Sequence, residues 1–578
     1  MEPALFQLAD STGVNFQNTV IDSKEENSFL FRNFYNGGGV ATGDINNDGL
    51  ADLLLTSNMG ENKLYLNKGN LRFEDITAAS GMKQDSMWST GVTFADVNND
   101  GWLDIYICNS GHIATGNRMN KLYINKQDLS FKESAAEYGL NHSGFCTQAS
   151  FFDYDMDGDL DCFIINNSPL PFTTVNAGNM RDKDVKDWTG DEKIKDGGNH
   201  LFKNENGFYK EVTREAGLHS GIVSYGLGVY TGDINNDGYP DIYVGNDFIE
   251  KDYCYINQKN GTFKDEMEQC MQSISMSSMS TDVADINNDG YPEIFTTDMI
   301  PDDDYRLKTT GTFDNFELYN TKQKQGLYHQ YVKNCLQLNN GNGTFSEISN
   351  FTGTFGTDWS WGAVFLDADN DGLNDLFVCN GINKDVGDLD YLDFFSNDVY
   401  ASMLQTGKKP EINEILQHIP VHPLPNRVFR NKGNLQFEDV GNSWGFSTPG
   451  FSNSVAYADL DNDGDLDIVI NNENQPASVY KNNSRVQNRN NYIGISLKGS
   501  PKNKFAIGAK IKVYKGKEIF TREVMPSRGF QSSVDHKQII GLGVIPAVDS
   551  MIIIWPDRSY SRIDQPALNK IPPALFIR

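Results

Sequence analysis

The sequence lacks several features that mark familiar classes of protein. Its 578 residues contain no apolar run of the roughly 18 residues that a transmembrane helix needs. The seven cysteines form no CxxC pair. Cys108, Cys162 and Cys379 lie in apolar strand-like runs, so we expect them to be small buried core residues, with disulfides or a redox site as the alternative. The opening "MEPALFQLAD" has no basic start and no apolar stretch. Two interpretations stay open: a cytoplasmic protein, or one whose targeting segment has been removed.

Positive charge and catalytic motifs are also scarce. Lysine and arginine number 49 against 78 acidic residues, and this net charge of −29 argues against nucleic acid or an anionic membrane surface as partner. None of the eight histidines belongs to an HExxH motif, and there is no GxSxG, P-loop or dinucleotide fingerprint. We therefore expect no enzyme. A carbohydrate-active enzyme is the alternative, because acid–base pairs drawn from distant segments escape motif reading.

What the sequence does contain is an acidic motif, D-x-[DN]-x-D-G-x-x-[DE], in seven copies. Oxygen-bearing side chains stand at positions 1, 3, 5 and 9, glycine at position 6 permits a sharp turn, and position 7 offers its backbone carbonyl. This flexible oxygen shell suits Ca²⁺ better than Mg²⁺, which needs a tight octahedron. Position 12 is never a carboxylate and the following residues read as strands, so the copies are not EF-hands. Solvated hairpin turns are the alternative.

The motif predicts up to seven structural calcium ions, held by positions 1, 3, 5, 7 and 9 of each copy. In chain order the predicted ligands are Asp44, Asn46, Asp48, Leu50, Asp52; Asp96, Asn98, Asp100, Trp102, Asp104; Asp153, Asp155, Asp157, Asp159, Asp161; Asp233, Asn235, Asp237, Tyr239, Asp241; Asp285, Asn287, Asp289, Tyr291, Glu293; Asp367, Asp369, Asp371, Leu373, Asp375; and Asp459, Asp461, Asp463, Asp465, Asp467.

Strand-like segments recur in a fixed order around each copy. A small-residue strand such as "GVTFAD" enters the loop; an apolar strand, a segment such as "NKLYLN" and an outer strand such as "FEDITAASG" follow it. Four strands per unit, with a shortest repeat of about 52 residues, are typical of a β-propeller. The last unit lacks its outer strand, and a matching segment stands at residues 5–13. We predict an all-β, seven-bladed propeller closed by this N-terminal strand.

The repeat ends near residue 485, which predicts a propeller over residues 1–485 and a small β domain over residues 486–578. Three units carry long insertions between their second and third strands, at residues 168–198, 299–333 and 381–425. These insertions should gather on the face opposite the calcium loops, where binding is expected. Within the last, "EINEILQHI" at residues 411–419 reads as a short helix.

Aromatic residues mark this expected ligand face. Some lie within the insertions, and others lie eight residues before a loop, where they should circle the axis of the ring. Packing is the plainer interpretation of both sets, and stacking platforms for a sugar or peptide are the alternative. The candidates are Trp88, Tyr225 and Trp359 before the loops, and Trp188, Tyr319 and Tyr391 in the insertions, with Phe172 and Phe313 beside the latter.

The loops and flanking strands resemble the FG-GAP/VCBS repeats of integrin-type β-propellers. The segments "NRNNYIGISLKG", "AIGAKIKVYKG", "PSRGFQSS", "IGLG" and "IIIWPD" resemble the ASPIC/UnbV domain. The combination is similar to the cartilage acidic protein family, and "DMIPDDDYRLKT" and "GLYHQYVKNCLQLNNGNGTFSE" resemble its version in surface lipoproteins of Bacteroidetes-type bacteria. The resemblance implies a secreted or outer-membrane protein with a lipid anchor on its native N-terminus, although the lipoprotein signal is absent from this sequence.

Three functions follow as expectations. The first is a non-catalytic, calcium-stabilised surface protein that binds an envelope protein partner, as a subunit of a nutrient-uptake type complex in the outer membrane. The second is a glycan-binding module, and the third is a polysaccharide lyase or hydrolase. A broad apolar patch on the insertion face favours the first, an exposed aromatic platform the second, and a deep pocket with paired carboxylates the third.

Overall fold

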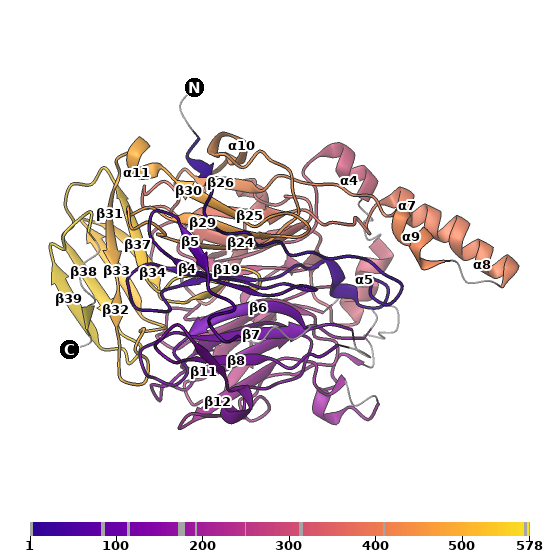
Figure 1. The fold of residues 1–578 in the computed structure, drawn as a ribbon, viewed down its shortest axis with the longest axis horizontal. Helices are drawn as coiled ribbons and strands as arrows, with labels where there is room; N and C mark the ends of the chain where they lie inside the picture. Colours follow the sequence, from indigo (N-terminus) through magenta and orange to yellow (C-terminus); the bar gives the residue numbers. More distant parts are fainter. Residues whose placement is uncertain are drawn as a thin grey trace.

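Antiparallel β-sheets dominate the molecule (Figure 1). The computed structural model describes residues 4–82, 87–112, 116–170, 180–190, 194–248, 250–310, 316–407, 411–570 and 575–576. Within these residues, seven antiparallel four-stranded units precede the C-terminal strands. The protein is therefore all-β, as its repeat pattern predicts.

We number the units as sheets 1 to 7 in chain order, naming strands from the first to the fourth. Their strands are β2 (Val40–Gly43), β3 (Asp52–Leu55), β4 (Lys63–Asn67), β5 (Phe73–Asp75); β6 (Trp88–Ala95), β7 (Asp104–Ser110), β8 (Lys121–Asn125), β9 (Phe131–Glu133); β10 (Cys146–Phe152), β11 (Asp161–Asn166), β12 (His200–Glu205), β13 (Phe208–Glu211); β14 (Gly226–Gly232), β15 (Asp241–Asn246), β16 (Tyr253–Asn257), β17 (Phe263–Asp265); β19 (Thr281–Ala284), β20 (Glu293–Thr296), β22 (Cys335–Asn339), β23 (Phe345–Glu347); β24 (Ser360–Leu366), β25 (Asp375–Asn380), β26 (Arg427–Asn431), β27 (Phe437–Asp439); and β28 (Ser452–Ala458), β29 (Asp467–Asn472), β30 (Ser478–Asn482), β1 (Phe6–Leu8).

The first strands of the seven sheets lie side by side in a cyclic order. The contacts run from β2 through β6, β10, β14, β19, β24 and β28 and return to β2. These strands are almost wholly buried, and small residues such as Gly91 and Gly228 allow the neighbouring backbones to approach closely. The fourth strands are short, and most bury one residue and expose the next, as expected for an outer edge facing water.

Sheet 7 takes its fourth strand from the other end of the chain. β1 pairs antiparallel with β30, with Phe6 opposite Asn482 and Leu8 opposite Tyr480. Phe6 is buried against Trp444 and Phe446, with ring centroids 6.3 and 5.2 Å away. Residues from both ends of the repeat region therefore share one sheet and one apolar cluster.

We call the strands that follow sheet 7 the tail. One sheet has the order β34-β33-β38-β39, and its apolar face packs with a second antiparallel pair, β31-β37, around Ile511, Ile553 and Trp555. The tail strands are β31 (Asn491–Ile495), β32 (Leu497–Lys498), β33 (Lys510–Lys515), β34 (Glu518–Glu523), β35 (Ser527–Arg528), β36 (Ser532–Ser533), β37 (Gln538–Gly543), β38 (Ser550–Ile554), β39 (Tyr560–Asp564) and β40 (Leu575–Phe576).

A hairpin of the tail enters the middle of the seven sheets. β36 pairs in parallel with β2, and bridges join Phe530 to Gly228 and Gly529 to Thr281. Phe530 is fully buried, with its ring centroid 5.4 Å from that of Trp361. The strand pattern of the sequence does not predict this insertion. We call residues 525–535 the tail hairpin.

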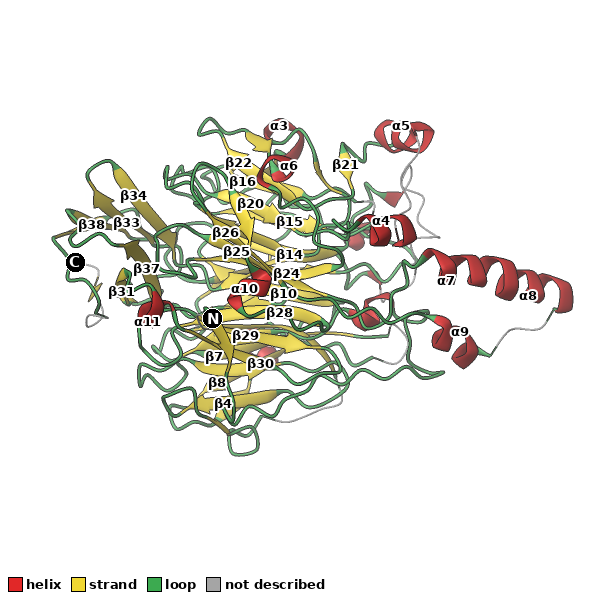
Figure 2. Cartoon of the chain, turned by 90° about the horizontal axis from the view of Figure 1, so that it is seen from above, coloured by secondary structure: helices red, strands yellow, loops and turns green. Residues whose placement is uncertain are grey.

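Helices are few and lie mostly in two of the insertions. Figure 2 shows α4, α5 and the helices α7 to α9 on the side of the sheets away from the tail. The predicted helix at residues 411–419 is confirmed as α9. The helices of the insertions are η3 (Val185–Asp187), α4 (Asp304–Thr310), α5 (Phe316–Lys324), α7 (Leu389–Phe394), the π-helix η5 (Phe395–Tyr400), α8 (Ala401–Thr406) and α9 (Ile412–His418).

Short elements complete the chain. They are η1 (Arg32–Tyr35), α1 (Ala135–Tyr138), α3 (Met267–Cys270), β18 (Ile274–Ser275), β21 (Gln330–Tyr331), α6 (Ser349–Thr352), α10 (Gly441–Trp444) and α11 (Ser484–Gln487). All seven cysteines are buried and free, which confirms the expectation of small core residues.

Candidate functional site

The seven acidic motifs form tight turns between the first and second strands of their sheets; we call them loops 1 to 7. In loop 1, the Asp44 carboxylate accepts backbone N–H bonds from Asp48 and Gly49, at 3.1 and 2.7 Å. The bond from the position-6 glycine to the first aspartate recurs in loops 2 to 6. Gly49 has a φ of +89°, so the turn needs glycine there. Short side chains and glycine thus fold each loop around its own carboxylates.

The position-9 carboxylate fastens each loop to its sheet. In loop 1, Asp52 accepts an N–H from Ile45 at 3.0 Å and another from Asn67 on the third strand at 2.7 Å. The equivalent pair of bonds recurs in all seven loops. Asp52 is fully buried. We predict position 9 as a metal ligand, and the structure gives it this anchoring role as well.

In most units, two asparagines connect neighbouring loops, and the motif pattern alone predicts neither role. At position 4, the Asn47 amide donates to the Gly101 carbonyl of loop 2, and Asn462 of loop 7 donates to Gly49 of loop 1, each at 3.1 Å. Near the end of the third strand, Asn67 donates to the Leu460 carbonyl of loop 7 at 2.9 Å. A signal is present in the sequence, because asparagine stands at position 4 in six loops and at or next to the end of every third strand. Position 4 also has a positive φ, which asparagine tolerates.

The loops fit a hard cation. In loops 3, 6 and 7, three carboxylates bring oxygens within 4.8 Å of one another. Among the described residues, buried oxygens of Asp153, Asp367 and Asp459 find no hydrogen-bond partner. Burial is the main cause that raises the pKa of Asp153 to about 7 and that of Asp367 to about 8. Carboxylates with unpaired, desolvated oxygens favour a cation among them. The side chains at positions 1, 3 and 5 and the carbonyl at position 7 would hold it.

The tail places cations on several loops. Lys510 contacts the first aspartate of loop 4, Asp233, at 2.6 Å, and Lys502 contacts Asp159 of loop 3 at 3.0 Å. Arg522 lies 3.6 Å from Asp367 of loop 6. Between the tail and loops 1, 2 and 7 lies a cleft of about 1300 Å³. Acidic and basic side chains both line it, so the loop face also has room for a ligand, which the sequence pattern does not predict.

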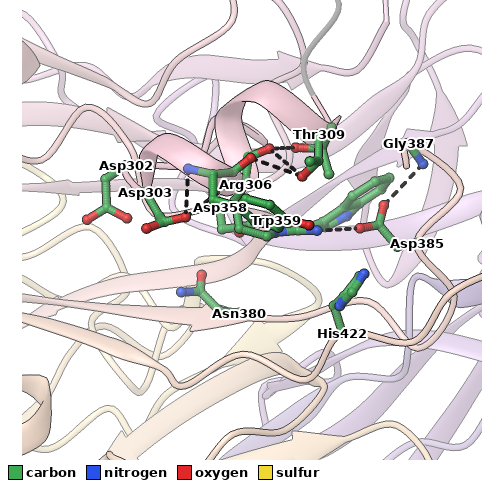
Figure 3. Close-up of polar contacts among 12 residues, drawn as sticks. Asp302, Asp303, Arg306, Thr309, Asp358, Trp359, Asn380, Asp385, Gly387 and His422 are labelled. Atoms are coloured by element: carbon green, nitrogen blue, oxygen red, sulfur yellow. Dashed lines mark hydrogen bonds and ion pairs between the residues drawn. The ribbon is translucent and has the colours of Figure 1, made fainter. Parts of the chain in front are cut away.

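On the opposite side, an arginine joins two insertions. Figure 3 shows Arg306 of α4 between Asp358 and Asp385. Its guanidinium donates two hydrogen bonds to Asp358, at 2.9 and 3.0 Å, and one to Asp385 at 2.9 Å. Asp385 is almost fully buried and precedes α7. A bidentate, largely buried pair of this kind fixes geometry, so the base of α7 is held firmly against α4.

Helices α7, η5, α8 and α9 form a long projection, which we call the arm (Figures 1 and 2). Tyr391 and Val399 pack inside it with residues of α9. Other apolar side chains point outward: Leu404 is 72% exposed and Tyr400 55% exposed. The π-helix η5 lies in the middle of the arm, and such helices are frequent at functional sites.

Half of the six predicted ligand-face aromatics are buried, and the other half are half-buried. Trp88 and Tyr225 are buried, as is Tyr391 within the arm. The remaining three, Trp359, Trp188 and Tyr319, are half-buried. Tyr319 shares a hydrogen bond of 2.6 Å with His329, which belongs to the same insertion. Phe172 and Phe313 lie outside the described residues.

A polar pocket of about 560 Å³ opens beside the arm. Asp22 and Lys384 face each other there at 4.0 Å, and amides from Asn413, Gln417 and Asn474 complete the polar lining. Behind the lining, Tyr35 donates a 2.5 Å hydrogen bond to Asp22. Amide, carboxylate and ammonium groups together can both donate to and accept from the hydroxyls of a ligand.

Among the described residues, no helix combines the length and the apolar character needed to cross a membrane. The described residues therefore contain no candidate for a helical membrane span.

Comparison with known proteins identifies both parts of the chain. The model of the FG-GAP-like repeat matches residues 27–107, 233–296, 327–378 and 421–470, and the model named ASPIC and UnbV matches residues 499–572. Cartilage acidic protein 1 of Xenopus tropicalis is 30% identical over 167 residues, which are 28% of this chain and 25% of that protein. The protein of the same name from Mus musculus is 29% identical over 133 residues, 22% of this chain and 20% of its own length.

The solved structures that resemble this one do so only loosely. An Agrocybe aegerita lectin, described as recognising non-reducing terminal N-acetylglucosamine, is 14% identical with a TM-score of 0.36, covering 70% of this chain and 80% of the lectin. Saccharomyces cerevisiae Sqt1 is 11% identical with a TM-score of 0.35, covering 81% and 99%. The chain spans about a quarter of the length of the curated relatives it matches. It combines FG-GAP-like repeats with an ASPIC and UnbV domain and is a distant relative of cartilage acidic protein 1.

Proposed function

We propose that the protein is a non-catalytic, calcium-stabilised extracellular binding protein that docks a protein partner of the outer membrane through the arm. The FG-GAP-like repeats and the relation to cartilage acidic protein 1 support an extracellular location. The arm carries the proposal, because it projects from the side opposite the tail and exposes apolar residues. A subunit of a nutrient-uptake complex fits this arrangement.

The scaffold of this function is a seven-bladed β-propeller over residues 1–485, closed by the N-terminal strand, with a separate β domain over residues 486–578. Three observations support closure. The first strands contact one another in cyclic order, β1 pairs with β30, and Asn462 bonds loop 7 to loop 1. A closed ring has no free central edge, so it presents the insertions rigidly.

Calcium is the cation that suits the loops. Their ligands are carboxylates, amides and a carbonyl on a flexible turn, the shell that Ca²⁺ accepts and Mg²⁺ rejects. Loops built from turn ligands bind in the roughly 10⁻⁴–10⁻³ M range of extracellular modules. A bound cation would reduce the repulsion among the carboxylates of each loop. It would also stiffen the ring of sheets at the face that carries the tail.

The test is purification of the tagged protein from its native envelope in calcium, with mass spectrometry of what is retained. We expect a stoichiometric membrane or lipoprotein partner. The double variant Tyr400→Ser/Leu404→Ser should lose it, because these exposed residues supply the apolar contact. Tyr560→Ser is the matched control, since Tyr560 is equally exposed but belongs to the tail. Retention of the partner by the arm variant, or a wild-type protein that purifies alone, would show the assembly role to be wrong.

Glycan binding is the second candidate, and the pocket beside the arm favours it. Its amides and the Asp22–Lys384 pair match the groups that bind sugar hydroxyls. A glycan array with wild type and Gln417→Ala separates the two functions. Binding that is lost in the variant would support the glycan function, while no binding by wild type would exclude it.

A further inference from the structure

The seven loops are not identical, and they differ at one ligand position. Position 3 is asparagine in loops 1, 2, 4 and 5, and aspartate in loops 3, 6 and 7. The second group therefore has one more carboxylate at positions 1, 3, 5 and 9 than the first. The residues at position 3 are Asn46, Asn98, Asn235 and Asn287, and Asp155, Asp369 and Asp461.

A second position, far from the first in sequence, changes with it in all seven units. It is the residue just before the final asparagine of the third strand. Where position 3 is asparagine, this residue is aliphatic; where position 3 is aspartate, it is basic. The residue before the final asparagine is Leu66, Ile124, Ile256 or Leu338 in the four asparagine loops, and Lys203, Arg430 or Lys481 in the three aspartate loops.

Each basic residue contacts the carboxylates at positions 3 and 5 of its own loop. Lys203 pairs with Asp155 and, at 3.1 Å, with Asp157. Arg430 lies 2.6 Å from Asp369 and 3.3 Å from Asp371. Lys481 makes the same two contacts in loop 7, with Asp461 and, at 2.9 Å, Asp463. The three cations therefore occupy equivalent places.

In three of the four asparagine loops, the amide at position 3 donates to the carboxylate at position 5; in loop 4, Lys259 contacts that carboxylate at 3.2 Å. Asn46 donates its side-chain N–H to the position-5 carboxylate of Asp48 at 2.9 Å. Loops 2 and 5 repeat this bond at 3.0 Å. Replacing the amide with a carboxylate removes this donor and adds a negative charge. A lysine or arginine on the third strand restores both the donor and the charge balance.

We propose that the third-strand residue balances the charge at position 3 of each metal loop, so that this residue and positions 1, 3, 5 and 9 together carry the same net charge in all seven loops. Positions 1, 5 and 9 give three negative charges in the asparagine loops. The aspartate loops have four and one tethered positive charge. The tail cations do not follow this division, because Lys510 reaches a loop of the first group, whereas Lys502 and Arg522 reach loops of the second. This inference rests on the calcium binding proposed above.

Loop 3 offers a direct test with three variants: Asp155→Asn, Lys203→Leu and the double variant. Amide hydrogen exchange of peptides covering residues 153–161, followed across a calcium titration, reads this loop alone. The calcium midpoint is the calcium concentration at which this protection is half complete. We expect Asp155→Asn to raise the midpoint about tenfold, which means weaker binding, and Lys203→Leu to lower it about tenfold, since each changes one charge beside the cation. The double variant should return to within about twofold of wild type.

Loop 1 gives the reverse exchange and an internal control. Peptides covering residues 44–52 should keep their calcium midpoint in all loop 3 variants, which shows that the ring is intact. Asn46→Asp/Leu66→Lys should bind calcium like wild type, while Asn46→Asp alone binds more tightly.

The outcomes separate this inference from the function on which it rests. If wild type shows no calcium-dependent protection in any loop, the metal assignment fails and the inference fails with it. If wild type responds but the single variants keep the wild-type midpoint, or the double variant does not restore it, calcium binding stands and charge setting by the third strand is wrong.

Discussion

At the scale of single residues, the environment of one carboxylate away from the loops disfavours its charged form. Glu473 is fully buried, and among the described residues neither of its oxygens has a hydrogen-bond partner of good geometry; the nearby side chain that favours its charge is Asn383. Burial raises the pKa of Glu473 to about 8, the nearby Asn383 side chain lowers it, and the charge of Asp22 raises it. The folded protein therefore binds a proton at Glu473 that the unfolded chain releases near pH 4.5.

Stability should consequently depend on pH through Glu473. Because its folded pKa is the higher one, its contribution is fully present below about pH 4.5 and is lost as the pH rises toward 8. We expect Glu473→Gln to raise the free energy of unfolding at pH 8 by about 3 kcal/mol relative to wild type, and by little at pH 4.5. Urea unfolding at the two pH values measures this, with exposed Glu25→Gln as control. Equal effects at both values would contradict it.

At the scale of elements, the strands and loops could be read from the sequence, but the tail hairpin could not. The turn chemistry of Asp44–Asp52 and the alternation of outer strands are local signals, so the repeat reveals them. The hairpin is fixed by contacts between residues far apart, such as Arg528 with Asp282 at 2.7 Å and Phe530 with Trp361. No spacing in the sequence predicts such pairs. The arm was predicted only as one short helix, because η5 and α8 have no strong periodic pattern.

The tail hairpin should contribute strongly to stability. Phe530→Ala removes a fully buried ring from the middle of the sheets and should cost about 3–5 kcal/mol. Hydrogen exchange should rise in residues 525–535 and in β2, with which the hairpin pairs. Val544→Ala, at a highly exposed tail position, is the control. A Phe530→Ala protein with wild-type exchange in β2 would show that the hairpin does not support the ring.

At the scale of the whole molecule, the proposed calcium loops and the tail share one face. The loops bring many buried carboxylates together, and the tail neutralises only some of them. Excess chelator should therefore lower the melting temperature by more than about 10 °C, because several sites each lose their bound cation. Differential scanning calorimetry measures this. After removal of the chelator, added calcium should restore the melting temperature, and magnesium at the same concentration as calcium should not. An unchanged melting temperature in chelator would show the metal assignment to be wrong.

The tail hairpin also sets the order in which the protein can be completed during synthesis. The ribosome makes β1 before the other described strands, yet β1 has no partner until β30 emerges about 470 residues later. The hairpin that fills the middle of the sheets emerges later still, at residues 525–535. Until then, the first strands surround an incomplete apolar centre that includes Leu227, Met279 and Trp361. A nascent chain should thus stay open to chaperones and proteases until the tail hairpin has been translated.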